Sequence, residues 1–255
     1  MSMDSKQRFS NRVDTYVKYR PSYPKEALDY LFGEVGMKPD SLVADVGAGT
    51  GIFSALLLER GARVVAVEPN EAMREEAETR LADSGDGRFE AVPGSAEETG
   101  LADRSVDFVT CAQSFHWFDR EATQAEFRRI LKPSGRVALI WNNRVTTGTP
   151  FLEEYEQLLL GLGTDYAKVN HRNVTKEHLE AFFRNGDVRE GRFSISQLFD
   201  FDGLSGRLRS SSYSPAPGTA GYEPMMKALR ELFDRNEQGG RVSMDYVTEV
   251  YWGEV

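Results

Sequence analysis

The sequence predicts an α/β fold in which helices cover both faces of a doubly wound, mostly parallel sheet. Three observations favour this fold class. Up to Trp141, short apolar segments alternate with helical patterns of about ten residues. A glycine turn follows the first apolar segment and leads directly into a helical pattern. Near the C-terminus, residues 240–252 alternate apolar and polar side chains, as an antiparallel edge strand would.

Strands and helices can be placed in turn along the first half of the chain. Short runs of aliphatic and β-branched residues predict strands at 41–46, 63–68, 88–92, 106–112 and 136–141. Amphipathic periodicity predicts helices at 24–35, 50–58, 70–82 and 119–131. Thr50, Asn70 and Asp119 are residue types that cap helix N-termini. Gly61 and the segment 132–135 would end two of these helices.

After Asn142 the pattern becomes less regular. Helices are predicted at 151–162, 175–184 and 222–236, strands at 193–201 and 240–252, and a segment rich in serine and arginine lies at 205–214. We expect a single domain. Within it, residues 9–142 would form the cofactor-binding core, 143–190 a small helical cap, and 191–255 the strands and helices that complete the same sheet.

Charge and composition exclude several classes of protein. The 255 residues carry a formal net charge of −9, which argues against non-specific binding to nucleic acid or to anionic membranes. The one cysteine, Cys111, permits no intrachain disulfide, and His116, His171 and His178 lack the spacing of a metal site. No apolar run reaches membrane length, and residues 1–8 lack the apolar core of a signal peptide. We therefore expect a cytoplasmic protein that binds no metal, nucleic acid or membrane. Composition does not distinguish a monomer from a homodimer, and we expect one of these two.

The glycine turn has the pattern G-x-G-x-G, at Gly47, Gly49 and Gly51. Glycine lets a ligand approach the backbone more closely than a side chain would allow. The dinucleotide fingerprint G-x-G-x-x-G needs a further glycine where Ile52 stands, so this fingerprint fails. Glu68 ends the second predicted strand, and a carboxylate there can accept hydrogen bonds from vicinal ribose hydroxyls. The turn and Glu68 together predict a nucleoside site without a pyrophosphate.

Asp45, at the end of the first predicted strand, allows two interpretations. It can accept hydrogen bonds from the amides of the turn as a structural helper, and it can also face an amino group of the ligand. Cys111 lies inside a predicted strand, so we expect a small buried hydrophobe rather than a nucleophile.

Five motifs in sequence order resemble the class I S-adenosylmethionine-dependent methyltransferases. They are V-A-D-V-G-A-G-T-G, V-E-P-N, G-S-A-E, F-H-W-F and R-I-L-K-P-S-G-R-V-A. Residues 19–24, 114–118 and 246–251 are similar to the small-molecule branch that includes trans-aconitate methyltransferase. The resemblance is clear over 9–141 and weaker beyond. It implies a Rossmann-like methyltransferase fold with a seven-stranded sheet, S-adenosylmethionine as the cofactor, and an enzyme that methylates a small molecule.

The resemblance also implies roles for individual residues. Those expected to contact the cofactor are Tyr16, Tyr19, Arg20, Asp45, Gly47, Ala48, Gly49, Glu68, Pro69, Asn70, Met73, Ser95, Ala96, Glu97 and Gln113. Many relatives have aspartate where this chain has Ser95, and a serine is a weaker partner for the adenine amine, so the Ala96 amide would contribute more. Met73 suits the core as well as the site. The N-terminal segment would fold over the site, with Arg20 suited to a carboxylate or to a surface ion pair.

His116 and Trp117 are expected to position the methyl acceptor. Methyl transfer from a sulfonium is a direct displacement, so alignment of the acceptor supplies much of the rate. A carboxylate acceptor, which the resemblance favours, is already ionised at pH 7. A phenol or an amine would need a base, and His116 is the histidine available for that role. Alternatively, Phe115 and Phe118 anchor a loop that has no catalytic part.

Beyond Asn142, four arginines could bind an acidic acceptor. They are Arg144, Arg172, Arg207 and Arg209. Taken singly, each of them also fits a solvated surface position.

Two other functions remain open. One is a non-catalytic protein that binds S-adenosylmethionine and methylates nothing. The other, less favoured, is a nicotinamide-dependent oxidoreductase, which Ile52 and the lack of a Tyr-x-x-x-Lys pair after the strands argue against. Nucleic-acid methylation is disfavoured because A-Q-S-F stands at 112–115, where an N-P-P-Y tetrad would be expected.

Overall fold

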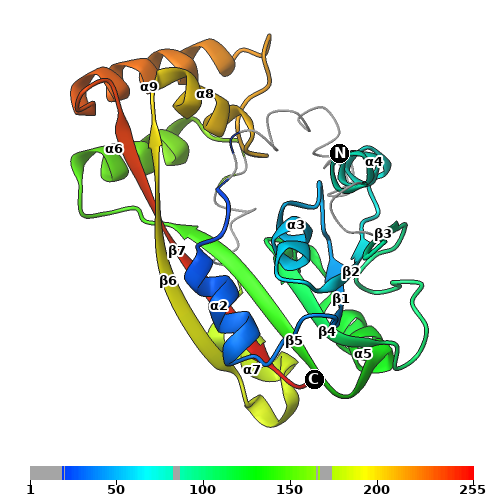
Figure 1. Ribbon diagram of the computed structural model, residues 1–255. Coiled ribbons are helices and arrows are strands. Elements are labelled where there is room, and N and C mark those ends of the chain that lie inside the picture. The colour runs from blue at the N-terminus through cyan, green and yellow to red at the C-terminus, as the bar shows by residue number, and fades with distance from the viewer. Residues whose placement is uncertain (1–18, 20, 83–86, 165, 167–173) are drawn as a thin grey trace.

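The computed structural model of this protein describes residues 19, 21–82, 87–164, 166 and 174–255 (Figure 1). Tyr16, Arg20 and Arg172, to which the sequence assigns roles, lie outside these residues. The described residues form a seven-stranded sheet with helices on both faces, and a helical lobe stands at one end of the longest strands (Figure 1). The predicted fold class is therefore confirmed.

The sheet has the strand order β3-β2-β1-β4-β5-β7-β6. Its strands are β1 (Leu42–Val46), β2 (Arg63–Val67), β3 (Phe89–Val92), β4 (Val106–Ala112), β5 (Leu131–Arg144), β6 (Arg189–Phe199) and β7 (Val242–Gly253). β1 to β5 pair in parallel, whereas β7 runs antiparallel to both of its neighbours. The order reverses between β1 and β4, and ligands of such sheets bind outside the carboxyl ends of the strands at this point.

The C-terminal strand does not lie where the sequence predicts it. We expected residues 240–252 at the edge of the sheet, but β7 lies between β5 and β6, and β6 forms the edge. In β7, Met244 and Tyr246 are buried while Ser243 is exposed. Such alternation reports that the two faces of a strand differ, and it carries no information about the strands on either side.

Helices cover the sheet in two layers, each with its own hydrophobic core. The helices of the core are α2 (Lys25–Gly33), α3 (Ile52–Glu59), α4 (Glu71–Leu81), α5 (Arg120–Ile130) and α7 (Lys176–Phe182), with the 3-10 turns η2 (Phe115–Trp117) and η4 (Arg184–Gly186). On one face α2 and α3 pack through a cluster that includes Leu31 and Leu57. On the other face α5 and α7 pack through Phe127 and Phe182.

Two of the predicted N-caps form and one is wrong. The Asn70 side chain accepts a hydrogen bond from an amide of α4 (3.1 Å), and Asp119 accepts from two amides of α5. Thr50 does not cap α3, because the N-cap is Gly51, which has a φ of 71°. A Cβ on Gly51 would lie 2.8 Å from a side chain of α4, so the chain needs glycine there for both its conformation and its space.

β5 begins earlier and ends later than predicted. The sequence indicates a helix end at 132–135 and a strand at 136–141, but the chain passes directly from α5 into β5. The added length at the carboxyl end is held by β7, whose ladder with β5 continues to the pair Arg144 and Tyr246. A local apolar pattern cannot reveal this extension, because the pairing partner lies far along the chain.

A helical lobe stands beyond the parallel part of the sheet, at the ends of β5, β6 and β7 (Figure 1). It consists of α6 (Pro150–Leu162), α8 (Phe201–Arg209) and α9 (Tyr222–Asn236), which share one cluster of buried side chains. The lobe draws on more of the chain than the cap predicted at 143–190, whereas α7, which falls inside that range, packs with α5. The sequence marked 205–214 by composition alone and missed α8.

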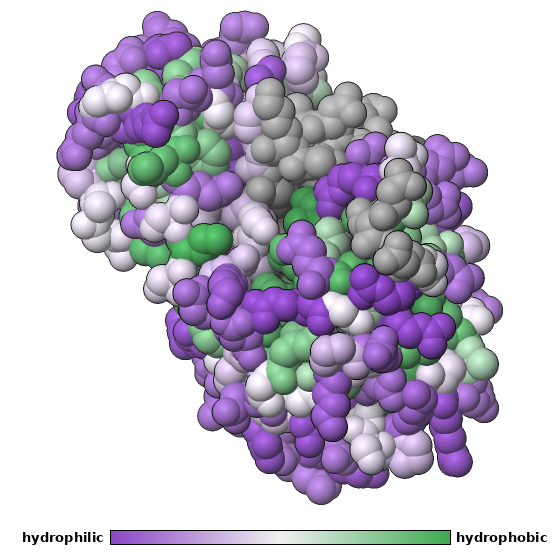
Figure 2. Space-filling view, in the orientation of Figure 1, coloured by the Kyte–Doolittle hydropathy of each residue, from purple (hydrophilic) through white to green (hydrophobic). Residues whose placement is uncertain are grey.

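Polar side chains dominate the surface seen in Figure 2, where hydrophobic ones form scattered patches. Within the described ranges, none of the helices has the length and apolar character needed to cross a membrane. The same residues contain no group of three or more His, Cys, Asp or Glu side chains that could hold a metal ion. Cys111 is fully buried in β4, and burial raises the pKa of its thiol, which suits a packing role rather than a nucleophile.

Candidate active site

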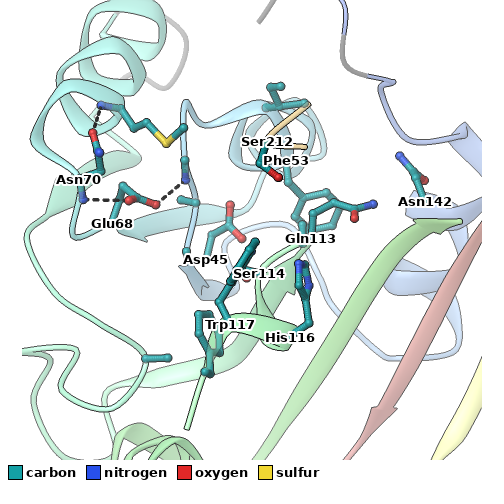
Figure 3. A pocket seen from close by; sticks show the side chains of 18 of the residues that line it. Asp45, Phe53, Glu68, Asn70, Gln113, Ser114, His116, Trp117, Asn142 and Ser212 are labelled. Carbon is teal, nitrogen blue, oxygen red and sulfur yellow. Dashed lines mark hydrogen bonds between the residues drawn. The ribbon is translucent and has the colours of Figure 1, made fainter. Parts of the chain in front are cut away.

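A cavity opens beside the carboxyl ends of β1, β2 and β4 and continues to the helical lobe (Figure 3). Its lining includes these residues that the sequence assigned to the site: Asp45, Gly47, Ala48, Gly49, Glu68, Pro69, Asn70, Met73, Ser95, Ala96, Glu97, Gln113, His116 and Trp117. They come from the segments that follow four different strands. The parallel sheet therefore brings together residues that are far apart in the sequence.

The N-terminal segment meets the cavity in part. Pro21 and Tyr23 line it, whereas Tyr19 is not among its lining residues. The Tyr19 ring lies on α8, where a Cβ at Gly206 would be 2.3 Å from a ring carbon. A direct contact of Tyr19 with the cofactor, as the resemblance implies, stays a prediction.

The glycine turn packs closely against the loop that follows β4. Gly47 has a φ of 69° and Gly49 a φ of 57°, a conformation that residues with side chains rarely adopt. A Cβ on Gly47 would lie 2.5 Å from the Cβ of Ser114. Only glycine at position 47 allows this approach, which exposes the backbone of the turn to the cavity.

We expect Gly47→Ala to lower the free energy of unfolding by about 2–4 kcal/mol, because it adds a steric clash to backbone strain. Gly148→Ala is the matched control, since Gly148 has a φ of 97° but nothing lies within 4 Å of its Cβ position. The free energy of unfolding of Gly148→Ala should fall only by the part that backbone strain contributes. Chemical denaturation of both variants measures the difference, and equal losses would show that the contact with Ser114 contributes nothing.

Glu68 links the glycine turn to the start of α4. Its Oε2 accepts a hydrogen bond from the Gly49 amide (2.9 Å) and its Oε1 from the Asn70 amide (2.9 Å), drawn as dashed lines in Figure 3. Burial raises the pKa of the Glu68 carboxyl, although the two amides oppose this effect. Each carboxylate oxygen keeps a second lone pair, so Glu68 can also accept hydrogen bonds from ligand hydroxyls.

Asp45 is fully buried at the end of β1. Its carboxylate accepts hydrogen bonds from Ser54 Oγ (2.6 Å) and Thr110 Oγ1 (2.9 Å). Burial raises the pKa of this carboxyl to about 6, against the lowering effect of the two hydroxyls. Asp45 thus ties α3 to β4 through hydroxyl groups. The sequence offered the turn amides as its partners, but the Gly49 amide donates to Glu68 instead.

The loop after β3 presents Ser95, Ala96 and Glu97 to the cavity. Ser95 Oγ accepts a hydrogen bond from the Glu98 amide (3.2 Å), and the Glu97 carboxylate accepts one from the Asp119 amide (3.0 Å). The Ser95 side chain therefore stabilises its own loop, and the Glu97 side chain joins this loop to the start of α5. Recognition of an adenine edge by this loop stays a prediction.

The loop after β4 carries the residues expected to face the acceptor. Gln113 has a φ of 63°, which is uncommon for a residue with a side chain and typical of functional loops. The backbone N–H of Gln113 donates to the Ile140 carbonyl (2.9 Å), so β5 holds the strained residue in place. Phe115 anchors the next turn, because its ring is buried against Phe182 (ring centroids 4.7 Å apart). Phe118, by contrast, lines the cavity.

His116 lies in this turn and lines the cavity. The indole N–H of Trp141 donates to His116 Nδ1 over a long distance of 3.4 Å. An imidazole that accepts at Nδ1 carries its proton on Nε2 and presents a donor there. This tautomer favours the positioning of an acceptor, whereas a general base would need an unprotonated Nε2.

The lining of the cavity also contains residues to which the sequence analysis gave no role. They include Phe53, Ser114, Asn142, Ser212, Tyr213 and Tyr246. Of the four arginines, Arg144 and Arg207 line the cavity and Arg209 does not. For the part of the lining that residues 205–214 contribute, the local signal in the sequence was the serine and arginine content of that segment. Tyr246 could not be assigned because its place depends on the pairing of β7 with β5.

Comparison with known proteins agrees with this geometry. Residues 44–139 match the model of a family described as "Methyltransferase domain". An uncharacterized methyltransferase of Mycobacterium tuberculosis is 41% identical over 136 residues, which are 53% of this chain and 52% of that protein. This chain thus aligns with about half the length of that relative. An uncharacterized methyltransferase of Schizosaccharomyces pombe is 28% identical over 254 residues, or 96% of each chain.

A solved structure extends the similarity to nearly the whole fold. A protein of Anaeromyxobacter dehalogenans, provisionally described as a type II methyltransferase, has a TM-score of 0.70 and 25% identity. The superposition covers 92% of this chain and 98% of that chain. Residues 44–139 thus resemble a methyltransferase domain, and the fold of nearly the whole chain is similar to that of a methyltransferase structure.

Proposed function

We propose that this protein transfers the methyl group of S-adenosylmethionine to a small molecule and releases S-adenosylhomocysteine. One observation carries the proposal: the buried Glu68 carboxylate lies 2.9 Å from the Gly49 amide, beside a turn that exposes its backbone to the cavity. A carboxylate in this place suits ribose hydroxyls. Ile52, in place of the last fingerprint glycine, begins α3 and lines the cavity, which disfavours a dinucleotide.

The lining residues fit the parts of this cofactor. Glu68 would hold the ribose hydroxyls, and the backbone of residues 47–49 would pack against the ribose and methionine parts. Ser95 and Ala96 would meet the adenine edge, and Gln113 the methionine part through its backbone. When bound, S-adenosylmethionine supplies an electrophilic methyl group on a sulfonium.

Besides binding the cofactor, the protein would align the methyl acceptor. Residues of the cavity would hold a lone pair of the acceptor in line with the methyl group that the bound cofactor would supply, so that the sulfur could leave with the electron pair of its bond to carbon. His116 and Trp117 would orient the acceptor, with His116 as a donor at Nε2. Alignment of this kind accounts for much of the rate of a displacement reaction.

A carboxylic acid is the acceptor that these groups support best. Its oxygen is ionised at pH 7, so no base is required. This agrees with the His116 tautomer, which offers a proton rather than accepting one. Arg144 and Arg207 bring positive charge to the same cavity. We therefore propose O-methylation of a small carboxylic acid.

Isothermal titration calorimetry tests the cofactor. We expect the protein to bind S-adenosylmethionine and S-adenosylhomocysteine, with no comparable response to NADH, because the turn lacks the last glycine of the dinucleotide fingerprint. Tight binding of NADH without binding of S-adenosylmethionine would overturn the proposed function.

A methyl-transfer screen tests catalysis. Small acids, phenols and amines are incubated with the protein and S-adenosylmethionine, and release of S-adenosylhomocysteine is measured. Turnover with acids supports O-methylation. Cofactor binding without turnover on any class would favour the non-catalytic alternative.

A further inference from the structure

Arg207 is a buried cation in the wall of the cavity. It lies on α8 with 6% of its surface exposed, and it lines the cavity. Its Nε donates to Tyr246 Oη (3.1 Å) and its Nη1 to Ser211 Oγ (2.9 Å). Both partners are neutral hydroxyls. Among the residues that the structure describes, none offers a carboxylate to Arg207, and none accepts a hydrogen bond from its Nη2.

The neighbouring Arg144 differs, because its charge is compensated. It forms an ion pair with Glu156, and Tyr166 donates to the same carboxylate (2.8 Å). Its guanidinium also lies 4.9 Å from the centre of the Tyr155 ring. Two arginines and one carboxylate therefore leave this end of the cavity with one positive charge that the described residues do not balance.

A buried charge without a counterion is costly, because neutral hydroxyls replace only part of its hydration. A protein keeps such a group where a ligand supplies the opposite charge. The guanidinium fork matches a planar carboxylate, which it binds through two parallel hydrogen bonds. One net positive charge matches a carboxylate monoanion better than a phosphate dianion.

Resting on the proposed function, we propose that Arg207 binds a carboxylate of the methyl acceptor that is not itself methylated. An oxygen held in the guanidinium fork has its lone pairs engaged, so it makes a poor nucleophile. Arg207 belongs to α8 of the helical lobe, whereas the glycine turn that would hold the cofactor joins β1 to α3, away from that lobe (Figure 1). The acceptor would thus carry two functional groups: an anchoring carboxylate at Arg207 and a nucleophile near His116. Arg207 is then a specificity-determining residue.

Calorimetry on the protein saturated with S-adenosylhomocysteine tests this anchor without turnover. The probes are succinate, glutarate and adipate, each paired with its diamide. We expect the best diacid to bind more tightly than its diamide. Arg207→Gln should weaken this binding by about 10- to 100-fold, the effect of losing hydrogen bonds from a charged group. Arg207→Lys should give an intermediate loss, and Arg241→Gln, which removes an exposed arginine outside the cavity, no loss.

Two further measurements distinguish an anchor for the acceptor from a cofactor ligand and from a purely structural arginine. Affinity for S-adenosylhomocysteine should be the same in all these variants, and a selective loss of it in Arg207→Gln would assign Arg207 to the cofactor's own carboxylate and overturn the inference. The melting temperature of ligand-free Arg207→Gln should equal or exceed that of the wild type, because an unbalanced buried charge is removed. A lower melting temperature with unchanged diacid binding would mean a purely structural arginine.

The inference also fails if no diacid binds the wild type better than its diamide. Failure of the wild type to bind S-adenosylhomocysteine is a separate result, because it would overturn the proposed function itself.

Discussion

Glu68→Ala is expected to weaken S-adenosylmethionine binding by about 1.5–3 kcal/mol, or roughly 10- to 150-fold. The variant removes the acceptor proposed for the ribose hydroxyls. It also frees the amides of Gly49 and Asn70, which the carboxylate now holds in place. The loss should therefore combine a missing ligand contact with a less ordered turn. Isothermal titration calorimetry measures it directly.

Two variants control this measurement. Glu68→Gln keeps one side-chain carbonyl but loses the charge, so its affinity should lie between those of the wild type and Glu68→Ala. Glu78→Ala removes an exposed carboxylate from α4, the helix that follows Glu68, and should not change the affinity. If Glu68→Ala binds the cofactor as tightly as the wild type does, the ribose is held by other groups.

Asp45→Asn is expected to stabilise the ligand-free protein at neutral pH by about 3 kcal/mol. Burial raises the pKa of Asp45 from 3.8 to about 6, and one pKa unit corresponds to about 1.4 kcal/mol. Below pH 3.8 the carboxyl is protonated in both the folded and the unfolded chain. Between pH 3.8 and about 6 the unfolded chain releases this proton while the folded chain retains it, so the wild type loses stability as the pH rises.

Chemical denaturation at several pH values checks this sign. The difference in the free energy of unfolding between Asp45→Asn and the wild type should grow in favour of the variant from pH 4 to pH 7 and then level off. Asp29→Asn is the contrasting control, because ion pairs with Arg60 and Lys25 lower the pKa of this exposed carboxyl. Its removal should not stabilise the protein at neutral pH. A difference curve for Asp45→Asn that stays flat across this range would mean that Asp45 does not titrate in the folded state as described.

The half of the site around the glycine turn could be predicted because its signals are local. A strand, a turn and a helix start lie within the few residues that contain Gly47 and Gly51, and Glu68 follows one unit later. The parallel sheet then places the ends of these strands side by side without further information. Even here, the hydroxyl partners of Asp45 depend on α3 and β4 and were missed.

The half of the cavity proposed to hold the acceptor could not be predicted, because long-range pairing builds it. Arg144 and Tyr246 face the same cavity only through the ladder between β5 and β7, and Arg207 reaches Tyr246 only through the packing of α8. No local pattern in the sequence indicates which of the four arginines beyond Asn142 would be buried. The position of β7 inside the sheet could not be predicted for the same reason. The alternation of apolar and polar residues indicates which face of a strand is buried, and it does not indicate which strands lie beside it.

The long ladder between β5 and β7 also bears on how the proposed acceptor specificity of this protein could change. Asn142 and Arg144 face the cavity, and the residue between them, Asn143, faces a groove on the opposite side of the sheet. A slip of one residue in this pairing would exchange the two sets of side chains completely. Insertions or deletions within these strands should therefore abolish the acceptor site, whereas point substitutions at its cavity-facing positions can alter specificity and leave the cofactor half untouched. Directed evolution toward another acceptor is best confined to those alternate positions.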